Sequence, residues 1–75
     1  MQFPSERVIQ LLRECFPAGS RVELTHMDDP YNKTLHEGCL GIVTGVDDIG
    51  TIHVAWDCGS SLGVAYGEDS CRRID

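Results

Sequence analysis

Positively charged residues are scarce in this 75-residue sequence, which has six Lys and Arg residues against twelve Asp and Glu residues and a formal net charge of −6. From Val22 to Cys71 there are nine carboxylates and a single cation, Lys33, because the arginines lie near the two ends of the chain. Binding to DNA or RNA draws most of its affinity from Lys and Arg side chains that neutralise phosphates. The scarcity of cations therefore argues against direct nucleic-acid binding and favours a basic partner, unless the acidic surface serves solubility alone.

Long hydrophobic runs are also missing, and charged residues begin at Glu6. A secretory signal needs an apolar segment of about 7–15 residues, and a membrane-spanning helix needs about 20. We therefore expect a cytoplasmic protein with no membrane association. A deep site that encloses a cofactor is not expected in so short a chain, although a shallow groove is compatible with its size.

The four cysteines are Cys15, Cys39, Cys58 and Cys71, and they lack the dense spacing of disulfide scaffolds. No C-x-x-C, C-x-x-H or H-x-x-x-H pair is present to begin a tetrahedral zinc site. We expect reduced thiols, with Cys15 and Cys71 filling small apolar positions. Neither a metal nor a cofactor is predicted.

One domain over residues 1–75 is expected, with a helix at about 5–16 and a small barrel at about 20–75. Ser5 can cap the helix, and Pro17 with Gly19 ends it. An apolar stripe at helical spacing predicts the face that packs on the rest of the domain: Val8, Leu11, Leu12, Cys15 and Phe16.

After Gly19 the apolar pattern changes to a period of two residues, which is typical of half-buried strands. Strands are predicted at Val22–Thr25, Cys39–Val46 and Thr51–Trp56, around Leu62 and Val64, and at the end of the chain up to Ile74. Asp47 and Asp48 are interpreted as turn formers at a hairpin tip that Gly50 completes. The alternation predicts three core residues in the central strand: Ile52, Val54 and Trp56. Five short strands after one helix predict a mainly β fold, a small, partly open barrel of the SH3-like type.

The run Gly38–Val43 has the form G-x-x-G-x-V, with glycines where a strand of a tight barrel bends or lets another backbone approach. It is similar to the small-barrel motif of the KOW type found in transcription and ribosome-associated domains. A closer resemblance covers almost the whole chain. The segments 17–24, 38–48, 52–57 and 59–60, and above all Met27–Tyr31 (Met-Asp-Asp-Pro-Tyr), resemble the small bacterial and phage-borne family known as domain of unknown function 4314. That resemblance implies an SH3-like barrel, often carried by mobile elements, with no assigned activity.

The candidate binding residues are Asp28, Asp29 and Tyr31 in the long loop 27–37, together with Tyr66 in a later loop. A tyrosine beside proline in a polar loop presents an apolar face with a hydroxyl tip, as interface residues do. In SH3-like barrels the loop after the first strand flanks a groove for extended peptides, which implies a cationic or proline-containing ligand here. Asp28 and Asp29 have an alternative role in shaping the turn before Pro30.

No pattern in the sequence indicates catalysis, because adjacent aspartates do not form an acid–base pair by spacing and no cysteine has a neighbouring histidine. We therefore expect a non-enzymatic interaction module that binds a protein or peptide through the 27–37 loop. Two alternatives stay open. One is an RNA- or ribosome-associated module, which the KOW likeness implies; the other is an acidic mimic of nucleic acid from a mobile element.

Overall fold

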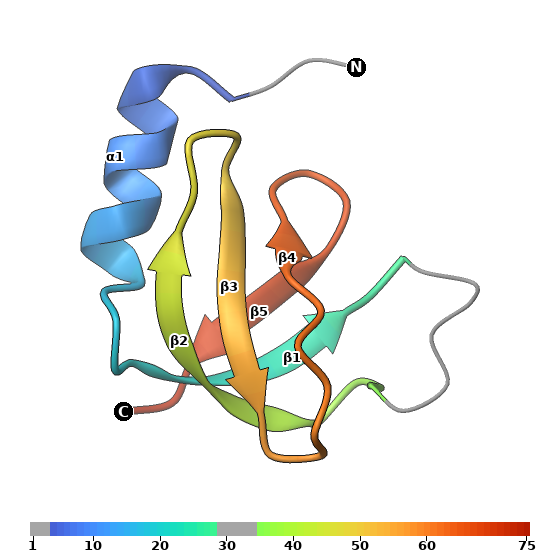
Figure 1. The fold of residues 1–75 in the computed structure, drawn as a ribbon. Coiled ribbons are helices and arrows are strands. Elements are labelled where there is room, and N and C mark those ends of the chain that lie inside the picture. Colours follow the sequence, from blue (N-terminus) through green and yellow to red (C-terminus); the bar gives the residue numbers. More distant parts are fainter. Residues whose placement is uncertain (1–3, 29–34) are drawn as a thin grey trace.

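A computed structural model describes residues 4–28 and 35–75 of the chain. One helix and five strands make up the fold, which confirms the predicted mainly β class (Figure 1). In chain order the elements are α1 (Glu6–Cys15), β1 (Arg21–His26), β2 (Leu40–Val46), β3 (Thr51–Trp56), β4 (Val64–Ala65) and β5 (Ser70–Arg73). The strand boundaries therefore lie within a residue or two of those that the periodicity predicts.

The five strands form one antiparallel sheet in the order β4-β3-β2-β1-β5. The strands β4 and β5 stand at opposite ends of that order, yet only residues 66–69 connect them. In a flat sheet these strands would be separated by four spacings of about 4.8 Å, more than a four-residue turn spans. The sheet therefore curls until its ends meet, as Figure 1 shows, without a hydrogen-bonded ladder between β4 and β5 among the described residues.

The interior of the curled sheet holds the apolar core. Ile52, Val54 and Trp56 are each no more than 4% exposed, which confirms the predicted inward face of β3. The Trp56 indole N–H donates to the Leu62 carbonyl oxygen at 2.9 Å, so its polar atom is satisfied inside the core. Leu35 is also buried, at 3% exposure, although it belongs to the 27–37 loop and was not among the residues predicted for the core.

The helix begins as predicted, because the Ser5 hydroxyl accepts a hydrogen bond from the Val8 N–H at 3.3 Å. Its predicted buried face is wrong in part. Ile9 is buried, whereas Leu11 is 52% exposed and Cys15 is exposed as well. On the same side of the helix as Ile9, the Arg13 guanidinium donates to the Val46 carbonyl oxygen and contacts the carboxylate of Asp48 at 2.8 Å, so this side of α1 faces the β2–β3 hairpin.

The glycines of β2 have different roles. Gly41 is buried, and a Cβ atom placed on it would lie 2.6 Å from Val54 Cγ1, 2.8 Å from the Trp56 ring and 2.9 Å from the Ala55 carbonyl oxygen. A Cβ placed on Gly45 would have no atom within 4 Å. The predicted close approach of another backbone therefore occurs at Gly41.

We expect Gly41→Ala to lower the free energy of unfolding by roughly 1–3 kcal/mol, because the added methyl group overpacks the β2–β3 contact. Gly45→Ala, on the same strand, is the matched control and should leave stability unchanged or raise it slightly. Urea denaturation of both variants measures the difference. Equal destabilisation by the two substitutions would contradict the packing argument.

Asp47 forms the β2–β3 turn, as predicted. One of its carboxylate oxygens accepts hydrogen bonds from the N–H groups of Ile49 (3.1 Å) and Thr51 (2.9 Å), and the other lies 2.9 Å from Nε2 of His53. Desolvation by itself would raise the pKa of Asp47, but the hydrogen bonds from Thr51, His53 and Ile49 outweigh it and lower the pKa below its ordinary value. Gly50 follows with a φ of 84°, the left-handed conformation predicted for it.

The lowered pKa of Asp47 has a defined consequence for stability. Its contribution is fully present above the unfolded-state pKa of about 3.9 and disappears as the pH falls through the lower folded-state value. Asp47→Asn should therefore lower the free energy of unfolding by about 1 kcal/mol near pH 6, and its difference from the wild type should shrink toward about pH 3. Asp48→Asn is the control, since the Asp48 side chain is 97% exposed. A loss of unfolding free energy in Asp47→Asn that is the same at every pH would contradict the lowered pKa of Asp47.

Candidate functional site

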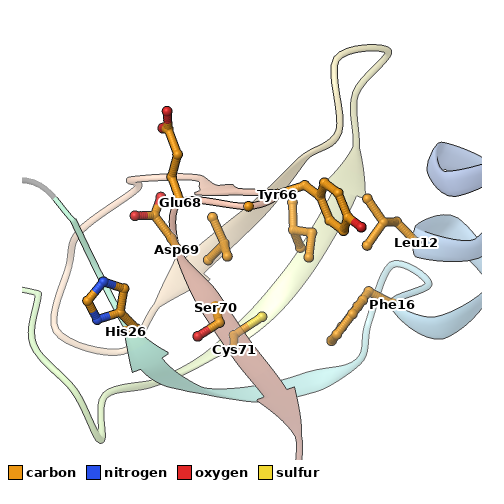
Figure 2. A pocket seen from close by; sticks show the side chains of 11 residues that line it. Leu12, Phe16, His26, Tyr66, Glu68, Asp69, Ser70 and Cys71 are labelled. Atoms are coloured by element: carbon orange, nitrogen blue, oxygen red, sulfur yellow. The ribbon is translucent and has the colours of Figure 1, made fainter. Parts of the chain in front are cut away.

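A groove of about 500 Å³ lies where the second half of α1 faces the β4–β5 end of the sheet (Figure 2). The helix contributes Leu12 and Phe16, and the sheet contributes the buried residues Ile52 and Val64. These side chains line one groove only because the curl of the sheet brings β4 and β5 close to the helix. The groove therefore has an apolar floor made by elements far apart in the sequence.

Tyr66 stands at the edge of this floor and is 54% exposed. Its backbone N–H donates to the Gly50 carbonyl oxygen at 3.3 Å, which fixes the start of the β4–β5 turn against the β2–β3 hairpin. Figure 2 shows the Tyr66 ring directed toward Leu12 and Phe16 of the helix. An exposed aromatic ring beside other apolar side chains is the composition of a protein-binding hot spot.

The opposite side of the groove is acidic, because the turn that follows Tyr66 contains Glu68 and Asp69. The two oxygens of Asp69 accept hydrogen bonds from the N–H groups of Asp28 (2.8 Å) and Ala65 (3.0 Å), so this carboxylate joins the end of β1 to β4. Glu68 is exposed and has no ion-pair partner within residues 4–28 and 35–75, and Figure 2 shows its side chain extending outward at the rim. Glu68 is therefore the carboxylate available to a ligand.

Two other polar side chains line the groove near β5. His26 is 59% exposed, and its Nδ1 lies 3.9 Å from a carboxylate oxygen of Glu37. Burial raises the pKa of the Cys71 thiol to about 11. At neutral pH this thiol is almost entirely protonated, which makes it a weak nucleophile.

The state of the Cys71 thiol can be measured directly. Near pH 8, alkylation of Cys71 by iodoacetamide in the folded protein should be roughly a hundredfold slower than alkylation of the same residue in denaturant. Mass spectrometry of proteolytic fragments gives the rate at this residue. Equal rates in the folded and unfolded chains would contradict the burial of Cys71 in the groove wall.

The structure places two of the four site residues that the sequence predicted. Tyr66 lines the groove, and Asp28 lies beside it with its backbone N–H bound to Asp69. Asp29 and Tyr31 fall outside the described residues. Sequence reasoning missed Leu12 and Phe16 as groove residues, because an apolar stripe on a helix predicts burial and does not indicate which members stay partly exposed.

Four of the five arginines are held in ion pairs with nearby carboxylates. Arg21 contacts Asp57 at 3.0 Å, and this hydrogen-bonded contact lowers the pKa of Asp57. The other pairs are Arg13 with Asp48, Arg72 with Glu23 and Arg73 with Asp75.

The part of the chain that the structure describes holds no group of three or more His, Cys, Asp or Glu side chains arranged for a metal ion. It also has no helix whose length and hydrophobicity suit a membrane crossing.

These features define a small, mainly β domain with one helix and an apolar groove that is acidic on one side. The chain belongs to the family described as Domain of unknown function (DUF4314), whose model matches residues 5–74. The match confirms the resemblance that the Met27–Tyr31 segment indicated. Comparisons with curated proteins and with solved structures give no significant match.

Proposed function

We propose that this domain is a non-enzymatic interaction module that binds an extended segment of a partner protein in the groove between α1 and the β4–β5 turn. The exposed Tyr66 ring, beside Leu12 and Phe16 above a buried apolar floor, is the observation that carries the proposal. Partly exposed apolar side chains that form one concave surface are typical of binding sites. The volume of about 500 Å³ suits one or two side chains of a partner.

The charge around the groove favours a cationic partner segment. Glu68 stands at the rim without a cation beside it among the described residues, and the region from Val22 to Cys71 has a surplus of eight negative charges, from nine carboxylates and one lysine. A segment with an apolar side chain next to Lys or Arg would place the first on the floor and the second near Glu68. The resemblance to SH3-like barrels implied a cationic or proline-containing ligand for Asp28, Asp29 and Tyr31, and the charge around the groove favours the cationic kind.

The 27–37 loop adjoins the groove at its start. The Asp28 N–H bonded to Asp69 places the end of β1 next to the acidic turn, so a ligand in the groove would lie near the first residues of this loop. The contribution expected of Asp29 and Tyr31 remains a prediction. The proposal therefore rests on Tyr66 and Glu68, with Asp28 beside them.

Two of the reactive side chains that line the groove, Asp69 and Cys71, are not poised for catalysis. The Asp69 carboxylate is engaged by two backbone N–H groups, and the Cys71 thiol is protonated at neutral pH. A general base or nucleophile needs a free lone pair near the working pH. Neither group meets that requirement.

The ion pairs favour a protein partner over the two nucleic-acid alternatives. Arg72 and Arg73, which an RNA-binding module would use, are paired with Glu23 and Asp75. A mimic of nucleic acid needs free carboxylates along one face, but Asp47 is bound in its turn and Asp57 to Arg21. Binding RNA through the arginines, or binding a partner as a mimic of nucleic acid through these carboxylates, would first break these contacts, and that cost would lower the affinity.

Titration with short synthetic peptides tests the proposal. Peptides with a central Leu or Phe flanked by Arg, and matched peptides flanked by Glu, are added to the isotope-labelled domain and followed by amide NMR shifts. We expect the Arg-flanked set to shift the signals of Leu12, Tyr66 and Ser70, with an affinity that Tyr66→Ala lowers about tenfold or more and Tyr66→Phe largely retains.

Charge reversals provide the matched comparison. Glu68→Lys should weaken binding of the Arg-flanked peptides, whereas Glu14→Lys makes the same change in charge on the face of α1 turned away from Leu12 and should have little effect. Equal weakening by both variants, or no shifts at the groove, would overturn the groove proposal. Shifts centred on Arg72 and Arg73 with an RNA oligonucleotide would instead favour the RNA-associated alternative.

A further inference from the structure

Two cysteines that are separated by 19 residues in the sequence lie together at one end of the β2–β3 hairpin. The sulfur atoms of Cys39 and Cys58 are 4.0 Å apart. Cys58 is exposed and Cys39 is partly exposed, so small reagents can reach the pair from solvent. Both thiols are free in the structure.

The strand register explains this proximity. Gly41 pairs with Trp56, and the Asp57 N–H donates to the Leu40 carbonyl oxygen at 2.8 Å, which extends the pairing by one residue. Cys39 directly precedes β2, and Cys58 lies in the turn that follows β3, which the hydrogen bond from the Gly59 N–H to the Trp56 carbonyl oxygen closes at 3.0 Å. The two side chains therefore meet at this end of the hairpin, where their sulfur atoms are close enough for a disulfide to form after side-chain rotation.

We propose that Cys39 and Cys58 form a dithiol site that small-molecule disulfides oxidise, reversibly, to an intramolecular disulfide. This proposal is independent of the groove, because neither Cys39 nor Cys58 is among the residues that line it. The site would add a redox-controlled cross-link between β2 and the turn that follows β3.

The reaction consists of two thiol–disulfide exchanges. The Cys58 thiolate, the more exposed of the two, attacks one sulfur of a disulfide RSSR, forming a mixed disulfide and releasing RS⁻. The Cys39 thiolate then attacks the Cys58 sulfur, forming the Cys39–Cys58 bond and releasing a second RS⁻. The two protein thiols are oxidised by loss of two electrons and two protons, and RSSR is reduced to two RSH. An excess of RSH reverses both steps.

The second exchange needs little movement of the protein. The sulfur atoms must approach from 4.0 Å to the bonded separation, a change of about 2 Å that side-chain rotation supplies. The backbone at Cys39 is already fixed, because its carbonyl oxygen accepts from the Leu24 N–H at 2.8 Å and its N–H donates to His36 O at 3.1 Å. A pre-positioned pair favours ring closure over a second mixed disulfide.

The other two cysteines are poor competitors. Cys71 lies in the groove wall, where burial raises the pKa of its thiol to about 11 and keeps it protonated. Cys15 is the last residue of α1 and has no place in the β2–β3 register. A zinc role for the pair is not supported, because tetrahedral sites use three or four protein ligands and no third metal-ligating side chain joins these two thiols in the described regions.

The experiment exposes the native chain to a redox buffer of oxidised and reduced glutathione and then blocks free thiols with iodoacetamide. Mass spectrometry should show loss of two hydrogen atoms from the fragments that contain Cys39 and Cys58, with no glutathione attached to either cysteine. Trypsin cannot locate the bond, since no Lys or Arg lies between Cys39 and Cys58. An aspartate-specific protease cuts between them at Asp47, Asp48 and Asp57, and the disulfide keeps the fragment with Cys39 joined to the fragment with Cys58. Reduction with dithiothreitol should separate them.

Three serine variants separate the proposed pairing from the alternatives. Cys15→Ser should form the bond as the wild type does. Cys39→Ser should stop at a glutathione mixed disulfide on Cys58, and Cys58→Ser should form no intramolecular bond involving Cys39. In the wild type the oxidised form should melt at a temperature roughly 10 °C higher than the reduced form, as expected for a cross-link that fits the native fold.

Either of two results would overturn the proposal. One is a wild-type protein that carries glutathione separately on Cys39 and Cys58 under native conditions. The other is a Cys39–Cys58 bond that forms in denaturant and not in the folded protein. Both would show that the fold does not bring the two thiols into reacting position.

Discussion

The Asp69 carboxylate joins β4 to the segment that follows β1, and the position of the β4–β5 turn depends on this contact. Its two oxygens bind the N–H groups of Asp28, at the end of β1, and Ala65, in β4. Charge-assisted hydrogen bonds of this kind are stronger than those between neutral groups. They fix the short β4–β5 turn in the position from which Tyr66 faces α1, so the groove and its acidic rim follow from the same contact.

Negative charge predominates on the surface of the domain. The chain has few cations, and four of its five arginines are paired with carboxylates, including Arg13 with Asp48 and Arg21 with Asp57. These exposed pairs contribute little to stability individually, but they connect the helix and β1 to the hairpin and to the turn after β3. The remaining carboxylates leave an acidic surface, which is the basis for proposing a cationic partner.

Sequence patterns predicted where the helix and strands lie in the chain better than they predicted how these elements are oriented relative to one another. The Ser5 cap, the alternating β3 strand and the Asp47 turn are local features, and each has the predicted structure. The predicted buried face of α1 was partly wrong because the rotation of a helix depends on its contacts with distant residues, such as those of Arg13 with Val46 and Asp48, more than 30 residues away. Leu35 was missed because a single apolar residue in a polar loop carries no periodic signal.

The sequence by itself determined the family, the mainly β class and most element boundaries, because turn residues and apolar periodicity act over a few neighbouring positions. It also singled out Tyr66 as a binding candidate. Only the tertiary structure decided what lies beside that tyrosine, and only the β2–β3 register brought Cys39 to Cys58. The groove and the dithiol pair are juxtapositions of residues far apart in the chain, created when the sheet curls and its strands pair, and no local pattern records which distant residues will meet.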